Sequence, residues 1–570
     1  MFISKNQAWS CLAFALCIPL AQQALAQQLT LPDPSEALRR QQERQQREQE
    51  QLQSAPDVHL PSPAVNATAS LLPTNESPCF TIERIELDGA QAQRFAWIKD
   101  ALTGNNDSPI QKCIGASGIH VLLKRAQDAL VAKGFVTSRV LAAAQDLSKG
   151  TLLLSVLPGR IGAIRFDAAS SPRGSAWNAV PAHAGDILNA RDIEQALENF
   201  KRVPTADASI DIAPGVQTFE SDLVISFKQA TPLRLNASID DSGSNSSGKY
   251  QGALTLSYDN WWSMNDVLYV TLNHDLGGGV QGERGTRGHT LYYAVPFGYW
   301  LLGSTVSRNG YYQSVAGAAQ NYVYSGASTT AELKLQRLIY RDAQRKTTLS
   351  LSAFQRTSNN FIDDSEVQVQ RRIVGGWDFG VNHKESLKQA TLEANLHYKR
   401  GTGAFGSLVA PEQAFGEGTS RFGIITADAN LTLPFAVKQQ PFKFSPSWRM
   451  QMNRTPLSPQ DRFAIGGRYT VRGYDGELSL AAERGWLLRN EVSMPLGASN
   501  QELYLGLDHG EVQGQSSALL VAKRLSGAAI GVRGQFKKMQ YDVFSARPVN
   551  RPSLFHTASS TAGFSLNLSY

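Results

Sequence analysis

The sequence predicts a transmembrane β-barrel of sixteen antiparallel strands, preceded by two small α+β units and an N-terminal polar helix. From residue 231 to the C-terminus, apolar and polar residues alternate with the two-residue period of a strand. The mean hydropathy is −0.26, and the chain holds 47 glycines, 17 tyrosines and 9 tryptophans. This composition suits a membrane barrel, because only every second residue of a barrel strand must be apolar. The N-terminal residues also have the pattern of an export signal.

The two faces of the predicted strands differ too much for a soluble fold. In residues 233–240 leucine, alanine and isoleucine alternate with polar and charged residues, and residues 392–399 repeat this arrangement. Residues 425–433 and 442–452 behave in much the same way. One face is too charged for a dry core and the other too apolar for water, so a barrel with lipid outside and water inside satisfies both. A soluble β-sandwich is the alternative, but it does not explain so long an alternation behind an export signal.

Counting the alternating segments gives sixteen strands over residues 231–570. They are predicted to begin near residues 232, 249, 266, 286, 299, 321, 345, 371, 388, 420, 442, 485, 500, 525, 539 and 558. Because the count is even and the N-terminal units are expected in the periplasm, the connection after the eleventh strand lies outside the cell or folds back into the barrel. The last strand is apolar at alternate positions and ends in the aromatic Tyr570.

Residues 1–26 have the pattern of a secretory signal peptide. A lysine precedes a mostly apolar run over residues 9–20, and Ala24-Leu-Ala26 provides a small-residue cleavage site. The apolar run is too short to cross a membrane as a helix. The sequence therefore predicts export.

Removal of the signal leaves two cysteines, Cys79 and Cys113. In an exported protein such a pair is more often a disulfide than two free thiols. Closing this loop would stabilise the fold by roughly 3–4 kcal/mol.

Residues 27–53 are expected to contain a polar helix, because residues 33–53 are strong helix formers rich in Gln, Glu and Arg, with Ser35 as a candidate N-cap. Apolar residues are nearly absent, so no face of this helix requires burial in an apolar core. The simplest interpretation is a solvated helix. Residues 54–77, with repeated Pro, Ser and Asn, predict a linker.

Two small α+β units are predicted between the linker and the barrel, over residues 78–157 and 158–230. The first has the order strand, helix, helix, strand, strand, with strands expected at residues 80–87, 136–141 and 151–157. The second has strands expected at residues 161–166, 208–212 and 221–227 and a helix whose apolar face is formed by Ile193, Ala196, Leu197 and Phe200. A single mixed domain is the alternative, and the repeated order of elements argues against it.

A glycine-dense, charged segment over residues 457–484 interrupts the series of strands. In the strand that includes residues 503–510, one face carries three leucines and the other carries Tyr504, Gly506, Asp508 and Gly510. If the leucines meet lipid, Asp508 points into the lumen, where an unpaired charge is costly. Arg472, in the interrupting segment, is the predicted partner of Asp508. Glu491 also faces inward if its apolar neighbours meet lipid, and it is the competing partner.

These motifs carry a resemblance to a known family. Val471, Arg472, Gly473 and Tyr474 resemble the signature of the sixth extracellular loop of two-partner secretion transporters, which export haemolysins, filamentous haemagglutinin and contact-dependent inhibition toxins. Tyr504, Gly506, Asp508 and Gly510 resemble the partner motif on the inner barrel wall. The resemblance covers essentially the whole chain, since the two α+β units are similar to POTRA domains. The last strand resembles a barrel-assembly signal, with Tyr570 where the family more often has Phe.

The resemblance implies a transporter in the outer membrane of a Gram-negative bacterium, with its POTRA domains in the periplasm. These domains would capture the unfolded secretion domain of one large β-helical exoprotein, by strand addition to an exposed sheet edge. The cargo would thread the lumen without ATP and fold outside. The polar helix would rest in the lumen as a plug, and the barrel assembly machinery, outer-membrane lipid and lipopolysaccharide would be further partners.

No phosphate-binding glycine loop, metal-spaced cluster or serine nucleophile elbow is present in the sequence, which therefore predicts no enzyme, cofactor or metal. The net charge of +6, from 55 basic and 49 acidic residues, gives no reason to expect a nucleic-acid partner. The alternative function is a barrel-assembly insertase of the same superfamily, which would have a weakly closed seam and usually more POTRA domains. A diffusion porin would leave the two periplasmic units without a role.

Overall fold

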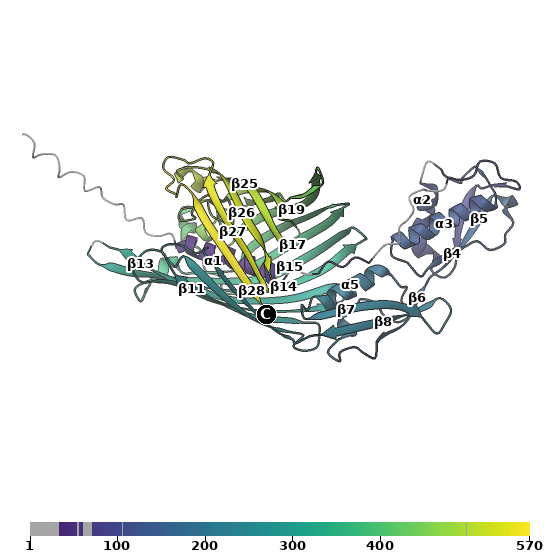
Figure 1. The fold of residues 1–570 in the computed structure, drawn as a ribbon, viewed down its shortest axis with the longest axis horizontal. Helices are drawn as coiled ribbons and strands as arrows, with labels where there is room; N and C mark the ends of the chain where they lie inside the picture. Colours follow the sequence, from purple (N-terminus) through teal and green to yellow (C-terminus); the bar gives the residue numbers. More distant parts are fainter. Residues whose placement is uncertain (1–33, 54–55, 61–70, 105–106, 318, 498) are drawn as a thin grey trace, which may run out of the picture.

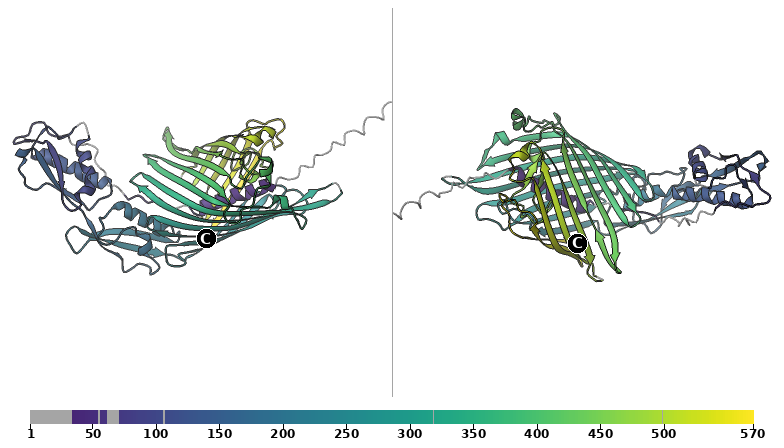
Figure 2. Two further views of the ribbon diagram at one scale, coloured as in Figure 1. Left: turned by 180° about the vertical axis from the view of Figure 1, so that it is seen from behind. Right: turned by 90° about the horizontal axis from the view of Figure 1, so that it is seen from above.

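The computed structural model describes residues 34–53, 56–60, 71–104, 107–317, 319–497 and 499–570. The predicted signal peptide, residues 1–26, lies outside the described residues. In chain order the structure contains a polar helix, two α+β domains and a closed antiparallel barrel (Figure 1). Both domains extend from one end of the barrel (Figure 2). No helix in the described part of the chain is both long and apolar enough to cross a membrane.

The closed sheet contains eighteen labelled strands, which occupy the sixteen predicted positions around the barrel. The two counts differ because β16 only prolongs the hairpin after β15, and because β20 and β21 share one position. The strands are β9 (Leu233–Asp240), β10 (Tyr250–Asp259), β11 (Val267–Gly277), β12 (Arg284–Phe297), β13 (Trp300–Ala316), β14 (Asn321–Arg341), β15 (Arg345–Ile362), β16 (Ser365–Glu366), β17 (Arg372–Leu387), β18 (Ala390–Thr402), β19 (Gly423–Val437), β20 (Gln440–Phe444), β21 (Ser447–Asn453), β24 (Arg484–Pro495), β25 (Gln501–Gln513), β26 (Arg524–Phe536), β27 (Met539–Pro548) and β28 (Thr561–Ser569). Each of the sixteen strand positions begins within three residues of its predicted start. The fold class is confirmed.

The two faces of the barrel wall follow the alternation of the sequence. On β25 the outward Leu505 and Leu507 are each 58% exposed, whereas the inward Tyr504 and Asp508 are 2% and 1% exposed. The barrel closes where β28 pairs with β9. The terminal Tyr570 extends this pairing, since its N–H donates to the Leu235 carbonyl at 2.8 Å and its carbonyl accepts from the Leu235 N–H at 3.0 Å.

The first α+β domain has the predicted elements in the predicted order, with one unpredicted short strand, β3 (Cys113–Ile114), between its two helices. Its elements are β1 (Phe80–Thr81), β2 (Arg84–Asp88), α2 (Trp97–Thr103), β3 (Cys113–Ile114), α3 (Ala116–Ala132), β4 (Arg139–Leu141) and β5 (Thr151–Leu157). The strand predicted over residues 80–87 is divided into β1 and β2, which belong to different sheets. The division falls where the apolar alternation changes parity, at the fully buried Ile82. The strand predicted over residues 136–141 is confined to β4.

The second α+β domain packs one helix on a three-stranded sheet of order β6-β8-β7. Its elements are β6 (Arg160–Phe166), α4 (Ala176–Ala179), α5 (Ala190–Lys201), β7 (Ala206–Pro214) and β8 (Glu220–Gln229). The four predicted apolar residues of α5 are all buried in the core of this domain. The short helix α4 was not predicted, because four residues leave no periodic signal.

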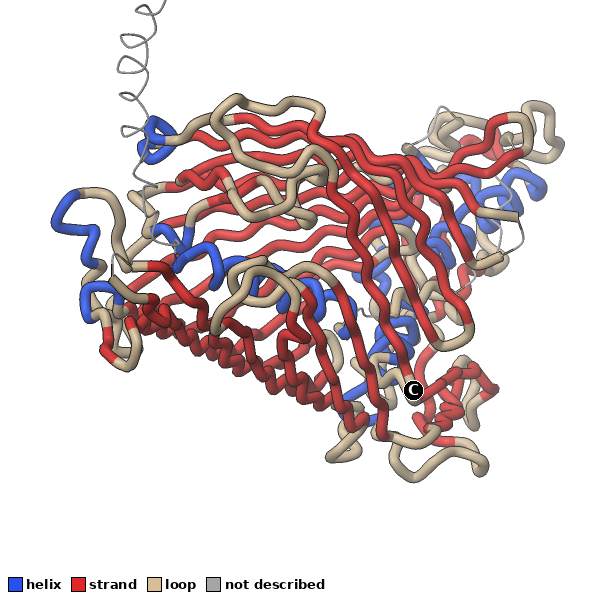
Figure 3. The backbone as a smooth tube through the Cα atoms, turned by 60° about the vertical axis from the view of Figure 1, so that its left-hand side comes forward, coloured by secondary structure: helices blue, strands red, loops and turns tan. Residues whose placement is uncertain are grey.

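The polar helix α1 (Pro34–Leu52) lies against the inner face of the barrel wall (Figure 3). The Gln41 side chain donates to the carbonyl of Gly310 on β13 at 2.9 Å, and that of Gln53 to the Tyr269 hydroxyl at 3.0 Å. Leu38 is buried against two wall tyrosines, although the sequence predicted no apolar burial for this helix. The expected N-cap is also wrong, because the helix already begins at Pro34 and includes Ser35.

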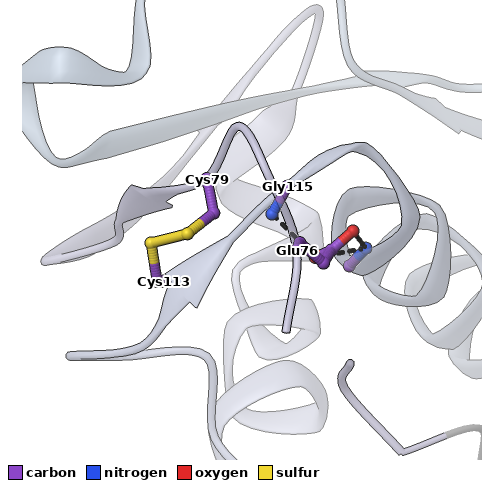
Figure 4. The surroundings of a disulfide bond; sticks show 5 residues. Glu76, Cys79, Cys113 and Gly115 are labelled. Atoms are coloured by element: carbon purple, nitrogen blue, oxygen red, sulfur yellow. Dashed lines mark hydrogen bonds between the residues drawn. A yellow bond between two sulfur atoms is a disulfide. The ribbon is translucent and has the colours of Figure 1, made fainter. Parts of the chain in front are cut away.

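Two contacts fasten the segment before the first domain's sheet to the start of α3 (Figure 4). Cys79 and Cys113 form a disulfide with their Cα atoms 5.2 Å apart. The Glu76 carboxylate accepts from the backbone N–H groups of Gly115, Ser117 and Gly118 at 2.7–3.1 Å. Partial desolvation raises the pKa of Glu76, but these hydrogen bonds outweigh it and leave the pKa below its usual 4.5.

We predict that Glu76 contributes stability to the first domain above about pH 4.5, and that this contribution is lost as the pH falls through its lowered pKa in the folded state. Replacing Glu76 with Gln should therefore reduce the urea concentration needed to unfold α3 at pH 7, and should flatten the dependence of that midpoint on acid pH. Hydrogen exchange of α3 across a urea series measures this. Equal midpoints for the variant and the parent at pH 7 would contradict the capping role.

Candidate functional site

The connection after the eleventh strand position folds back into the barrel. It forms a hairpin of β22 (Phe463–Ile465) and β23 (Leu480–Ala482), which pair with each other and not with the barrel sheet. Residues 466–479 form the tip, and we call residues 457–483 the inner loop. The side chains at the tip that carry the predicted motif are buried. The inner loop is therefore a lumen element and not a free surface loop.

Arg472 is the most strongly held residue of the inner loop. Its Nε and Nη2 donate to the two carboxylate oxygens of Asp508 at 2.7 and 2.8 Å, and its backbone N–H donates to the same group at 3.0 Å. Its Nη1 donates to Glu491 at 2.9 Å. Arg472 and Asp508 are 4% and 1% exposed. The two candidate partners thus bind the same guanidinium, Asp508 by a bidentate pair and Glu491 by a single bond.

Two further arginines join this cluster, and the sequence reasoning missed both. Arg533 on β26 pairs with Glu491 at 2.6 Å, and the Arg489 Nε lies 3.8 Å from Asp508. Arg533 also lies over the ring of Tyr504, at 4.8 Å from the guanidinium carbon to the ring centroid. Strand parity could have found Arg489, because it lies two residues before Glu491 on β24 and so shares its inward face.

Glycines, which have no side chain, leave the space that Arg472 occupies. A Cβ on Gly506 would lie 2.3 Å from the Arg472 Nη2, and one on Gly527 would lie 1.6 Å from the Arg472 carbonyl oxygen. Gly473 has a φ of +105°, and a Cβ there would lie 2.4 Å from the carbonyl oxygen of Arg547. Glycine is required at these positions for space, and at Gly473 for backbone conformation as well.

Val471 and Tyr474, on either side of Arg472 in the sequence, pack into an apolar cluster. Both are buried, with 0% and 2% exposure, among residues of β22, β23 and the barrel wall. Gly510 belongs to the same contact, since a Cβ there would lie 3.1 Å from the Val471 side chain. The Tyr474 hydroxyl bonds to the carbonyl of Ser526 at 3.0 Å and to Asn550. The loop tip is thus fixed by packing as well as by charge.

The inner loop is also tied to other parts of the wall. Asp461, near its start, binds Arg356 of β15 at 2.8 Å, and Arg468 binds Asp241, just after β9, at 2.7 Å. Helix α1 contacts the tip from the other side, because Arg39 donates to the Ser479 hydroxyl at 2.8 Å and Arg40 to the Gly476 carbonyl. Loop and helix together occupy the lumen.

At the periplasmic end, residues 56–60 of the predicted linker are held between α5 and the barrel. The backbone N–H groups of Val58 and Leu60 donate to Glu198 and Glu194 of α5 at 2.9 and 3.0 Å. Arg341, at the end of β14, binds the same two glutamates at 3.0 Å and is 2% exposed. Residues 56–60 of the predicted linker are therefore ordered against the domain and barrel rim.

These groups form a network of ion pairs that can lock or release a loop, and they carry no arrangement of nucleophile and base. Within the described ranges, no group of three or more His, Cys, Asp or Glu side chains is arranged to hold a metal ion. A barrel with a lumen filled by a helix and a folded-back loop, and with two α+β domains at one end, defines an outer-membrane transporter of the POTRA type.

Comparison with known proteins gives the family. Residues 220–534 match the model of the haemolysin secretion/activation proteins ShlB/FhaC/HecB, residues 80–159 match the ShlB-type POTRA domain, and residues 160–214 match a further POTRA domain model. The chain belongs to this family and is an outer-membrane transporter of two-partner secretion, with its POTRA domains in the periplasm.

Several relatives are similar over most of their length. The outer membrane transporter CdiB-2 of Burkholderia pseudomallei is 36% identical over 96% of this chain and 97% of its own. The haemolysin transporter ShlB of Serratia marcescens is 24% identical over 70% of this chain and 71% of its own. The structure of CdiB from Acinetobacter baumannii has a TM-score of 0.82, 30% identity, and coverage of 94% of this chain and 99% of that one.

We predict that a cysteine in place of Arg472 crosslinks faster to a cysteine at 508 than to one at 491. The backbone of Arg472 contacts Asp508 directly, whereas Glu491 is reached only by the end of the long guanidinium side chain. A cysteine is too short to span that distance, because disulfides need Cα atoms about 4.4–6.8 Å apart. Mass spectrometry after mild oxidation of each double variant measures the two yields. Faster crosslinking to position 491 would contradict the geometry.

Proposed function

We propose that this transporter captures one large unfolded exoprotein through its POTRA domains and passes it through a lumen that the inner loop and helix α1 close at rest. One observation carries the proposal: two separate elements occupy the lumen, and both make hydrogen bonds or ion pairs with their surroundings, to which the inner loop adds the apolar packing of its tip. Hydrogen bonds and ion pairs of the protein can be exchanged for bonds to water, so these contacts can open and re-form when the two elements move. No catalytic step is assigned to the chain, and the export is driven by folding of the exoprotein outside.

The exoprotein proposed is of the contact-dependent inhibition class. The support is the higher identity to CdiB-2 of Burkholderia pseudomallei, at 36%, than to the haemolysin transporter of Serratia marcescens, at 24%. Co-expression with one exoprotein of each class, followed by assay of the culture supernatant, separates the two candidates. Export of a haemolysin but not of the inhibition-class exoprotein would overturn this assignment.

Three further partners belong to the proposal. The barrel assembly machinery would recognise the last strand, whose alternate apolar residues end at the exposed Tyr570. Outer-membrane lipid and lipopolysaccharide would cover the outward apolar face, of which Leu505 and Leu507 are examples. We propose no cofactor or nucleic-acid partner.

Helix α1 is proposed as the plug that leaves the lumen when the exoprotein passes. The contacts of the helix, and of Gln53 just after it, with the wall and the inner loop are made mainly by glutamine and arginine side chains, whose hydrogen bonds water can replace. Leu38 is the exception, with 3% exposure. Leaving the lumen exposes little apolar surface and so costs little of the hydrophobic stabilisation.

We predict that deleting residues 33–53 raises the single-channel conductance in planar bilayers and leaves much of the secretion intact. The helix fills lumen space at rest but must vacate it during export, so its loss opens the channel without removing the export route. A matched variant with Glu50, an exposed residue of α1, replaced by Ala should keep the parent conductance. Unchanged conductance after the deletion would contradict the proposal that the helix blocks the lumen.

We predict that Arg472→Ala reduces secretion by roughly tenfold while assembled, heat-modifiable protein stays in the membrane. Its ion pair with Asp508 is worth roughly 1–4 kcal/mol at dielectric constants between water and protein surface. Arg472→Lys should be intermediate, because lysine keeps the charge but not the bidentate geometry. Arg371→Ala, which removes an exposed arginine paired with Glu366, is the control and should secrete normally. Normal secretion by Arg472→Ala would refute the role of the inner loop.

A further inference from the structure

The segment from Ser171 to Asn178 of the second POTRA domain lies on the outward side of the barrel's periplasmic rim. Its Arg173 guanidinium carbon is 5.7 Å from the ring centroid of Tyr258, and Arg173 donates to the Tyr258 hydroxyl at 3.4 Å. Tyr258 is on the same face of β10 as the lipid-facing Leu254 and Leu256, which are 45% and 49% exposed. A periplasmic domain thus touches the part of the barrel that meets the membrane.

Buried amides fix this segment on the barrel. The side chain of Asn178, 1% exposed, donates to the carbonyl of Pro296 at 3.0 Å and accepts from Asn265 at 2.8 Å. The Asn178 carbonyl accepts from the N–H of Gly298 at 2.7 Å. These bonds join the segment to two turns at the POTRA end of the barrel, between β10 and β11 and between β12 and β13. The neighbouring Trp177 therefore keeps a fixed position relative to the membrane boundary.

Trp177 is exposed at the end of the barrel that carries further exposed aromatic residues. It is 68% exposed, and its ring lies 5.7 Å from that of Phe297 at the end of β12. Trp261 and Trp262, in the turn after β10, are 48% and 66% exposed. Tryptophans at the end of a membrane barrel occupy the headgroup region, where the ring is partly apolar and its N–H meets water.

Arg173 adds an unneutralised cation to this surface. Among the described residues, no carboxylate lies within 4.0 Å of its guanidinium, although most arginines of the inner loop and barrel rim have one. The guanidinium donates instead to the Tyr258 hydroxyl and the Asn260 carbonyl, both at 3.4 Å. A guanidinium has five N–H donors, so it retains donors for an outside anion such as a phosphate.

We propose that Arg173 and Trp177 form a phospholipid-binding element that anchors the second POTRA domain to the periplasmic leaflet of the outer membrane. Trp177 enters the headgroup region next to Trp261 and Trp262, and Arg173 binds the phosphate of a glycerophospholipid. This surface continues the lipid-facing wall and faces away from the lumen, which favours lipid over the exoprotein as its occupant. The anchor would fix the direction in which the exposed edge strand β7 is presented in the periplasm.

The test places a reporter at Trp177. The mature protein with Trp177→Cys is labelled with an environment-sensitive fluorophore and reconstituted in vesicles of phosphatidylethanolamine and phosphatidylglycerol. Cys79 and Cys113 do not react, because they are disulfide-bonded. Lipids with a nitroxide on the headgroup should quench about half of the fluorescence, as expected for a side chain in the interface. Pro172→Cys, in the same exposed segment, provides a second labelling site if the first variant misfolds.

A matched control uses Val216→Cys in the same domain. Val216 is 99% exposed at the far end of the β7–β8 hairpin, roughly 30 Å along the strands from the end that meets the barrel. Its label should not be quenched. Adding Arg173→Ala to the Trp177 reporter should reduce the quenching, and this reduction should be larger at low salt.

Equal quenching at positions 177 and 216 would overturn the proposal. It would also be overturned if the Trp177 label were unaffected by the nitroxide lipids but became shielded when an unfolded secretion domain was added. The surface would then belong to the exoprotein. Neither outcome would alter the proposed export through the lumen, which the conductance and secretion measurements test separately.

Discussion

Burying a guanidinium costs several kcal/mol unless carboxylates neutralise it and accept its hydrogen bonds. Arg472, at 4% exposure, satisfies this condition where two inward carboxylates lie on adjacent strands, Glu491 on β24 and Asp508 on β25. The glycines at 506 and 527 leave the space that its side chain and backbone occupy. The position of the inner loop therefore depends on a match between one loop residue and a small area of wall.

The same match determines how the lumen is filled. With the tip held at Asp508, the Gly476 carbonyl and the Ser479 hydroxyl face helix α1 and accept from two of its arginines. The helix then lies between the inner loop and β13, where Leu38 and Gln41 make their contacts. At the other end, the linker that follows the helix is bound by the α5 glutamates. Movement of the helix would therefore change contacts of the inner loop and, through the linker, of the second POTRA domain.

Much of the fold could be predicted because a barrel strand repeats every two residues over a long stretch. Parity alone placed Leu505 and Leu507 on the lipid face and Asp508 in the lumen, and the structure agrees. Parity does not say how many partners a charge has. The prediction set Asp508 against Glu491 as alternatives, whereas one guanidinium with several donors binds both.

The remaining features depend on contacts between distant segments. Leu38 is a single apolar residue in a polar helix, and nothing local shows that two wall tyrosines cover it. Arg533 is placed by the order of strands around the barrel, which pairs β25 with β26. The split of the first POTRA strand at Ile82 was signalled by the change of parity, but the second sheet that it creates was not. Short elements such as α4 have too few residues for a period.

If the inner loop gates the lumen through its ion pair, Arg472 and Asp508 act in secretion as one unit. The most direct measurement is a double-mutant cycle on the secretion rate, with Arg472→Ala, Asp508→Ala and the double variant compared at equal amounts of assembled barrel. If the two residues act together, the double variant secretes about as well as the weaker single variant, because the second change removes nothing further. If the two losses multiply, the residues act independently, and the inner loop does not work through this ion pair.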